Sequence, residues 1–291
     1  MAESSLADGL REHVVVLGER IGERNLRLPA KLEAAAVYVE GVLRRWGAEV
    51  RREEYRCRGA PVRNVEGVLK GAGEGVVLVG AHYDSVAGSP GANDNGSGVA
   101  ALLEMARLLA GRPLAQTVRL VAFVNEEPPF FQSPEMGSYV HAAEARRRGD
   151  PITAMFSLET VGCYSDEPGS QRYPMPLGLF YPNVGNFVGF VSNLPSRGVL
   201  HRAVAAFRRH TSFPCEQVAV PGWIAGVGWS DHWSFWKHGY PGVMVTDTAP
   251  FRYVHYHTAE DTPDKIDYPR MAEVVKALTG MVGDLAGAMT P

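Results

Sequence analysis

The sequence predicts an α/β fold, a three-layer α/β/α sandwich around a central sheet that is mixed but mostly parallel. Strand-like and helix-like segments alternate through the middle of the chain, which is typical of a parallel sheet with helices on both faces. Segment 118–124, VRLVAFV, is almost continuously apolar, as expected of a strand that is buried on both faces. The sequence has neither an internal repeat nor a low-complexity linker, so residues 1–291 are predicted to form a single domain.

The first eighty residues predict two helices followed by paired strands. Apolar residues recur at helical spacing over 6–20 and over 29–46. Apolar and polar residues alternate over 49–57 and over 62–69, which predicts a β-hairpin or meander. This pair leads into the short apolar strand 76–79.

The rest of the chain continues the alternation. Helical spacing of apolar residues and short apolar runs between turn residues define these elements. The helices are predicted over 98–110, 136–148, 200–210, 231–238 and 268–289, and the strands over 118–124, 152–158, 216–220 and 243–245. The stretch 166–189 is rich in Pro and Gly and is predicted to form long loops. Such loops in a compact domain usually serve a function, here as walls of a substrate cleft.

Composition and charge exclude several classes of protein. The chain has 29 basic and 32 acidic residues and a net charge of −3, so neither a nucleic acid nor a membrane is predicted as a partner. No stretch has the ~20 apolar residues of a membrane span, and the N-terminus lacks the apolar core of a secretory signal. Cys57, Cys163 and Cys215 are odd in number and far apart, which suits reduced thiols and a cytoplasmic location.

Polar side chains stand at the ends of three apolar runs. His82 follows the first run, Glu126 and Glu127 follow the second, and Glu159 follows the third, while Asp94 precedes a predicted helix. Each residue alone has an ordinary explanation as a solvated or hydrogen-bonded side chain. Carboxylates at the ends of buried strands must nevertheless be paired, coordinated or hydrogen-bonded. Open α/β sheets build their sites at these strand ends.

A metal site accounts for these residues together with His257 near the C-terminus. Two imidazoles and three carboxylates suit zinc and suffice for two ions that share a ligand; the set is His82, Asp94, Glu127, Glu159 and His257. Glu126 is left over beside a ligand, where hydrolysis needs a free base to move a proton. Asp84 lies two residues beyond His82, where its side chain is placed to accept the second ring N–H and fix the tautomer.

The motifs that contain these residues resemble those of the co-catalytic di-zinc aminopeptidase family, whose distant relatives include glutamate carboxypeptidase II, glutaminyl cyclase and the transferrin receptor. HYDS, GANDNGSG, NEE, SLETVG and YHTAEDT occur in the family's order, and the similarity covers nearly the whole chain. The resemblance implies a zinc-exopeptidase-like fold and two Zn²⁺ per chain. The sequence departs from the commonest pattern at Glu159, where many members have Asp.

The resemblance also implies how the ligands are divided between the two ions. Asp94 would bridge both ions. His82 and Glu159 would complete one site, and Glu127 and His257 would complete the other.

Further residues would act beside the metals by the same resemblance. Glu126 would be the general base, Tyr256 would donate a hydrogen bond to the tetrahedral intermediate, and Asp231 would support the ligands. The Asp94–Asn95 peptide bond would be cis. Five aromatic residues are candidates for the walls of a specificity pocket, although packing is the ordinary role of each: Phe130, Phe131, Tyr164, Trp223 and Trp229.

The function that these residues and the resemblance imply is that of a zinc-dependent exopeptidase, specifically an aminopeptidase that removes N-terminal residues from peptides. A metal-bridging hydroxide would attack the scissile carbonyl, with Glu126 as the base. Two alternatives stay open: a glutaminyl-cyclase-like acyltransferase with one zinc, and a non-catalytic binding protein on the same fold. A peptide substrate is the predicted partner, and the oligomeric state is left open.

Overall fold

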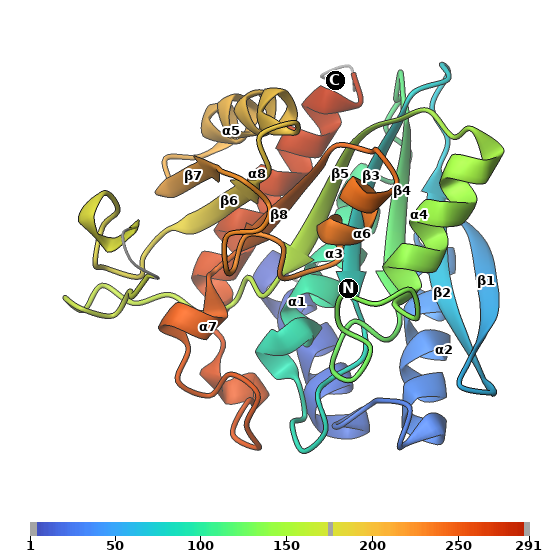
Figure 1. Ribbon diagram of the computed structural model, residues 1–291, viewed down its shortest axis with the longest axis horizontal. Helices are drawn as coiled ribbons and strands as arrows, with labels where there is room; N and C mark the ends of the chain where they lie inside the picture. The colour runs from blue at the N-terminus through green and yellow to red at the C-terminus, as the bar shows by residue number, and fades with distance from the viewer. Residues whose placement is uncertain (1–4, 174–176, 288–291) are drawn as a thin grey trace.

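A single mixed sheet organises the computed structural model, which describes residues 5–173 and 177–287. Its eight strands are β1 Glu49–Cys57, β2 Ala60–Leu69, β3 Val76–His82, β4 Thr117–Phe123, β5 Ile152–Glu159, β6 Val188–Ser192, β7 Cys215–Ala219 and β8 Gly242–Thr246. Their order is β1-β2-β4-β3-β5-β8-β6-β7 (Figure 1). Four of the seven neighbouring pairs are parallel, and β1/β2, β2/β4 and β6/β8 are antiparallel. The predicted mixed, mostly parallel sheet is confirmed.

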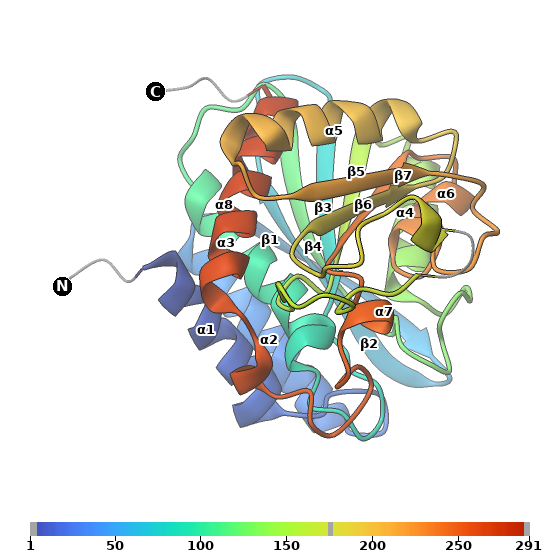
Figure 2. The same cartoon turned by 90° about the vertical axis from the view of Figure 1, so that its left-hand side faces the viewer.

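Helices cover both faces of this sheet. The α-helices of the described chain are α1 Leu6–Val15, α2 Pro29–Arg45, α3 Gly98–Leu109, α4 Gly137–Arg148, α5 Arg197–His210, α6 His232–Lys237, α7 Ala249–Arg252 and α8 Tyr268–Leu285, of which the short α7 lies beyond the strand ends and not on a face. Figure 2 shows α1, α3 and α8 together on one side of the sheet, with α4 and α6 on the other. The α/β/α layers are therefore as predicted. Among the described helices, none combines the length and apolar character that crossing a membrane requires.

The two faces of β3 show why the sheet lies at the centre of the fold. Side chains alternate between the faces of a strand, so Val77 and Val79 join a large hydrophobic cluster with residues of α1, α3 and α8. Val76 and Leu78 join a smaller cluster that contains Phe235 of α6. All of these strand residues are buried, as the continuous apolar run indicates.

Some element boundaries differ from the prediction. Strand β6 and helix α7 were not predicted, because both are short and β6 lies beside the Pro- and Gly-rich stretch. The N-terminal helix passes into a π-helical turn, Val16–Ile21, and the C-terminal helix ends at Leu285, within the predicted range 268–289. Short elements such as β6 depend on pairing with distant strands, here β7 and β8, and so leave little local signal.

The parallel strands bring the predicted site residues to one edge of the sheet. Strand β3 ends at His82 and β5 ends at Glu159, while Glu126 and Glu127 follow β4. The turn before α3 reaches the same edge, because the side-chain amide of Asn95 donates to the carbonyl of Leu158 at 2.7 Å. Segments that are far apart in the sequence therefore meet here.

Candidate metal centre and active site

The five predicted ligands converge at this edge. Donor atoms of His82, Asp94 and Glu127 all lie within 4.8 Å of one another. Nε2 of His82 is 3.5 Å from Oε2 of Glu159, and Nε2 of His257 is 3.2 Å from Oε2 of Glu127. The structure thus brings together all five residues of the predicted set.

Asp94 lies between two groups of donors. Its Oδ1 is 3.3 Å from Nε2 of His82, on the side of Glu159. Its Oδ2 is 3.0 Å from Nε2 of His257, on the side of Glu127. One carboxylate with an oxygen on each side is the arrangement that two neighbouring metal ions need.

The donor set fits metal ions of the zinc type. Several donor atoms are buried without a hydrogen-bond partner among the described residues, namely Nε2 of His82 and of His257, Oδ1 and Oδ2 of Asp94 and Oε1 of Glu127. The acidic residues Asp94, Glu126, Glu127 and Glu159 are all buried, each at most 9% exposed as a whole residue. Burying this much negative charge is costly unless cations accompany it. Neutral imidazole and carboxylate are the donors that zinc takes in catalytic sites.

Burial raises the pKa of three acids of the site, whereas His257 and His82 lower that of Asp94. Burial and the neighbouring charge of Asp94 raise the pKa of Glu127 to about 7. Burial also raises the pKa of Glu126 well above its ordinary value and raises that of Glu159. Divalent cations reverse this tendency, since they are the largest charges in such sites.

Asp84 orients both a ligand and the Glu126–Glu127 pair. Nδ1 of His82 lies 3.2 Å from the carbonyl oxygen of Asp84 and 3.6 Å from its Oδ1, so the backbone carbonyl is the hydrogen-bond partner and not the carboxylate that the sequence predicted. A carbonyl oxygen can only accept, so this contact places the ring proton on Nδ1 and leaves Nε2 as the metal donor. The Asp84 carboxylate accepts the backbone N–H groups of Glu126 and Glu127 at 3.1 and 3.2 Å.

Asp84→Asn is expected to lower zinc affinity by about 10–100-fold, the usual cost of losing a partner that orients the ligands. The new amide keeps one accepting oxygen, but its NH₂ group then faces a backbone N–H donor. Competition with a chelator measures the affinity, with the exposed Asp264→Asn as control. Equal affinity in a well-folded Asp84→Asn protein would contradict this role.

Of two other predicted residues, Tyr256 contacts a ligand and Asp231 does not form a hydrogen bond to one within the described residues. The ring of Tyr256 stacks on His257, with 3.9 Å between ring centroids. Asp231 is fully buried, and burial raises its pKa to about 7, but no hydrogen bond links it to a ligand within the described residues. Ser230 makes such a bond instead, donating to Oε2 of Glu159 at 2.7 Å.

Two buried aspartates hold the turn that contains Asp94, and sequence reasoning missed both. Asp261 accepts the backbone N–H groups of Asn93 and Asp94 at 2.8 and 3.1 Å. Asp247 accepts from the side chains of Asn93 and Thr160 at 3.0 and 2.7 Å. The Asp94–Asn95 peptide bond is cis, as the resemblance implied. Asp261 belongs to the YHTAEDT motif, which was the available signal for it.

Arg24 fixes the loop between His82 and Asp94 from the other side. Its guanidinium is fully buried and donates to the carbonyl oxygens of Tyr83, Pro90 and Gly91 at 2.7, 2.6 and 2.8 Å. Burial lowers its pKa to about 10. No sequence motif marks this residue, because its guanidinium bonds only to backbone carbonyl oxygens, three of them on a distant loop and two, those of Leu17 and Gly22, nearby.

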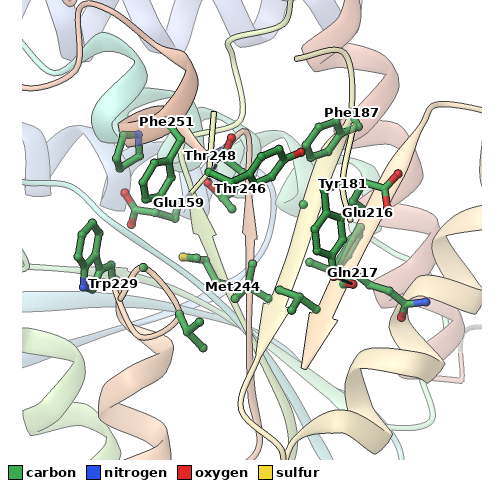
Figure 3. Close-up of a pocket in the computed structure, with 18 of the residues that line it drawn as sticks. Glu159, Tyr181, Phe187, Glu216, Gln217, Trp229, Met244, Thr246, Thr248 and Phe251 are labelled. Carbon is green, nitrogen blue, oxygen red and sulfur yellow. Dashed lines mark hydrogen bonds between the residues drawn. The ribbon is translucent and has the colours of Figure 1, made fainter. Parts of the chain in front are cut away.

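A pocket of about 110 Å³ opens beside Glu159. Figure 3 shows Trp229 and Phe251 near Glu159, Met244 and Thr246 on the floor, and Tyr181 with Phe187 farther along. Of the five aromatic candidates, Trp229 lines this pocket, whereas Phe130 and Tyr164 are buried in the core. The pocket is thus an apolar and aromatic space that adjoins the metal-type donors.

Comparison with known proteins identifies relatives over most of the chain. "Uncharacterized protein YfbL" of Escherichia coli is 38% identical over 275 residues, covering 91% of this chain and 84% of that protein. "Probable leucine aminopeptidase 1" of Trichophyton verrucosum is 28% identical over 240 residues, covering 77% of this chain and 58% of that protein. This chain therefore spans less than two thirds of the fungal relative.

Solved structures support the fold. BSAP, a zinc aminopeptidase from Bacillus subtilis, has a TM-score of 0.75 at 17% identity and covers 96% of this chain and 95% of its own. Glutaminyl cyclase of Porphyromonas gingivalis has a TM-score of 0.75 at 21% identity and covers 97% of this chain and 100% of its own. The family model described as peptidase family M28 matches residues 64–282. Since that range is more than half of the chain, the protein belongs to peptidase family M28.

Proposed function

We propose that this protein is a zinc-dependent aminopeptidase that binds two Zn²⁺ ions and removes N-terminal residues from peptides. The observation that carries the proposal is the division of five donors by the two oxygens of Asp94, with Glu126 beside them and outside both groups. Membership of a peptidase family supports the reaction class. The aminopeptidase names of several relatives support the choice of substrate end.

Each ligand has its place in the proposed centre. His82 and Glu159 would hold one ion, Glu127 and His257 the other, and Asp94 both. Zinc held there would polarise the scissile carbonyl and lower the pKa of the attacking water.

The protein's own groups would move the proton and steady the developing charge. Glu126 takes a proton from the attacking water as its oxygen bonds to the carbonyl carbon. It then delivers that proton to the amine nitrogen as the C–N bond breaks. The position of Glu126 supports this role, because its Oε2 lies 3.9 Å from Nε2 of His82, beside the donors and outside both groups. Tyr256 would donate to the carbonyl oxygen, and the acidic end of the cleft would hold the α-amine of the peptide.

The proposal is tested by measuring zinc per chain and hydrolysis on the same preparation. We expect two zinc ions per chain and release of the N-terminal residue from a panel of aminoacyl amides. Acetylation of the α-amine should abolish cleavage. Hydrolysis of the acetylated panel at an equal rate, or of none of the free-amine panel, would contradict the aminopeptidase.

A second candidate is a glutaminyl-cyclase-like acyltransferase with one zinc. Its support is the likeness to the glutaminyl cyclase of P. gingivalis, which extends over all of that chain. Cyclisation of peptides that begin with glutamine, at one zinc per chain and without release of amino acids, would favour it over the aminopeptidase.

A further inference from the structure

The strand register places Glu216 in line with the metal-type donors. Glu159 of β5 pairs with Thr246 of β8, Thr246 pairs with Gly189 of β6, and Gly189 pairs with Glu216 of β7. Adjacent strands lie about 4.8 Å apart, so three spacings put the Cα atoms of Glu159 and Glu216 roughly 14 Å apart. A carboxylate thus stands at each end of one row of residues across the sheet.

Both ends of this row face the same pocket. Gln217 points to the other face, where its Oε1 lies 3.2 Å from Nδ1 of His201 on α5. Side chains alternate along a strand, so Glu216 points to the face that carries the pocket, and it is among the residues that line it. Figure 3 shows Glu159 and Glu216 on opposite sides of the pocket, with Met244 and Thr246 between them.

Gly189 keeps the floor of the pocket open between the two carboxylates. A Cβ atom at this position would lie 3.4 Å from the carbonyl oxygen of Thr246 and 3.5 Å from Cγ2 of Thr248. These are ordinary contacts, so the fold tolerates a methyl group here, but a larger side chain would fill the space in the middle of the row. An extended ligand group can therefore lie across Gly189.

The carboxylate of Glu216 is half-buried among aromatic side chains. No hydrogen bond or ion pair engages it within residues 5–173 and 177–287. The hydroxyl of Tyr181 donates to the carbonyl oxygen of Gln217 at 3.0 Å, which holds this ring over β7. Burial and the charge of Glu216 raise the pKa of Tyr181. A ligand that fills the pocket would remove water from this carboxylate, and that is costly unless the ligand brings a cation to pair with it. The aromatic walls also favour a cationic group.

Arg252, a cation behind the pocket wall, is already engaged by other groups. It packs on Phe187, 4.6 Å from the ring centroid, and donates to the carbonyl oxygens of Cys163 and Phe187 and to Gln171. Burial lowers its pKa, while the charge of Asp247 opposes that effect. The charged residues that line the pocket, among those the structure describes, are therefore Glu159 at the metal end and Glu216 at the far end.

We propose that Glu216 is a specificity residue that selects a long cationic side chain, Lys or Arg, at the N-terminus of the substrate. The inference rests on the proposed aminopeptidase function. With the scissile carbonyl at the Glu159 end, the aliphatic stem lies along Met244 and Gly189, and the terminal charge meets Glu216. A short or branched apolar residue would fill only the near half of the pocket.

The test compares substrates that differ by the terminal charge alone. Lysyl and norleucyl p-nitroanilides share a straight aliphatic stem, and arginyl, leucyl and glutamyl substrates complete the panel. We expect the zinc-loaded wild type to favour lysyl and arginyl substrates over norleucyl by at least tenfold in kcat/KM. Glu216→Gln should lower kcat/KM for the two cationic substrates by about tenfold, equivalent to about 1.4 kcal/mol. It should leave the norleucyl value within about twofold.

Two controls keep the inference separate from the proposed function. Glu74→Gln changes an exposed glutamate before β3, far from the carboxyl ends of the strands, and should change neither value. Calorimetry of L-lysine amide and L-norleucine amide binding to wild type and Glu216→Gln measures selectivity without turnover. If wild type binds the lysine amide selectively and Glu216→Gln does not, the pocket assignment is supported, whether or not a substrate is cleaved. A protein that binds in this way but cleaves no substrate would overturn the aminopeptidase function alone. An active enzyme that favours norleucyl, leucyl or glutamyl substrates, or whose lysyl preference survives Glu216→Gln, overturns the inference and leaves the aminopeptidase standing.

Discussion

Glu126→Gln is expected to lower kcat by at least about 100-fold while the protein keeps its zinc. A positioned base contributes about 10²–10⁴-fold to such a reaction, and glutamine keeps the shape of glutamate but cannot accept the proton. Glu126 is 3.9 Å from Nε2 of His82 through its Oε2, farther than Asp94 or Glu159. The substitution therefore removes a proton acceptor that belongs to neither group of donors.

The adjacent Glu127 provides the matched control. Its Oε2 lies 3.2 Å from Nε2 of His257, so Glu127→Gln should lose metal and activity together. Zinc content, kcat and affinity for a substrate-like inhibitor are measured on the same preparations of both variants. Loss of zinc from Glu126→Gln with retention in Glu127→Gln would show that the two roles are reversed. Near-normal turnover by Glu126→Gln would rule out its role as the base.

Much of the fold could be predicted because short stretches of the sequence define its strands and helices. The buried strands β3, β4 and β5 are short apolar runs, and their carboxyl ends are marked by His82, by Glu126 and Glu127, and by Glu159. Parallel pairing of such strands brings their ends to one edge. The candidate ligands at these strand ends could be recognised before the structure, because residues that directly follow neighbouring parallel strands must lie close together at one edge of the sheet.

The supporting contacts could not be predicted in the same way, because they depend on long-range packing. Arg24 reaches backbone carbonyls some sixty residues away, and Ser230 reaches Glu159 over a similar separation. Asp231 illustrates the difficulty: family resemblance pointed to it, whereas the hydrogen bond to the ligand comes from its neighbour. Glu216 stood in a predicted strand, but its relation to Glu159 appears only through the pairing of four strands, one of which was not predicted.

Asp94→Ala is expected to weaken both zinc ions, whereas Glu127→Ala or His257→Ala should remove mainly one. The reason is geometric: Oδ1 of Asp94 faces the donors His82 and Glu159, and Oδ2 faces His257 and Glu127. Each single-site variant leaves three donors intact on the other side. Only Asp94→Ala deprives both sides at once.

The stoichiometry at rising chelator concentration distinguishes these variants. Glu127→Ala and His257→Ala should retain one tightly held zinc per chain, and Asp94→Ala should lose both at lower chelator than wild type. The affinity loss should exceed the about 10–100-fold expected when a residue that merely orients a ligand is replaced. Asp264→Ala, an exposed change, should match wild type. Two tightly bound zinc ions in all three ligand variants would contradict the assignment of ligands. A single zinc in the wild type, lost completely from His257→Ala, would instead favour one mononuclear centre, because then Asp94 would have no second ion to bridge.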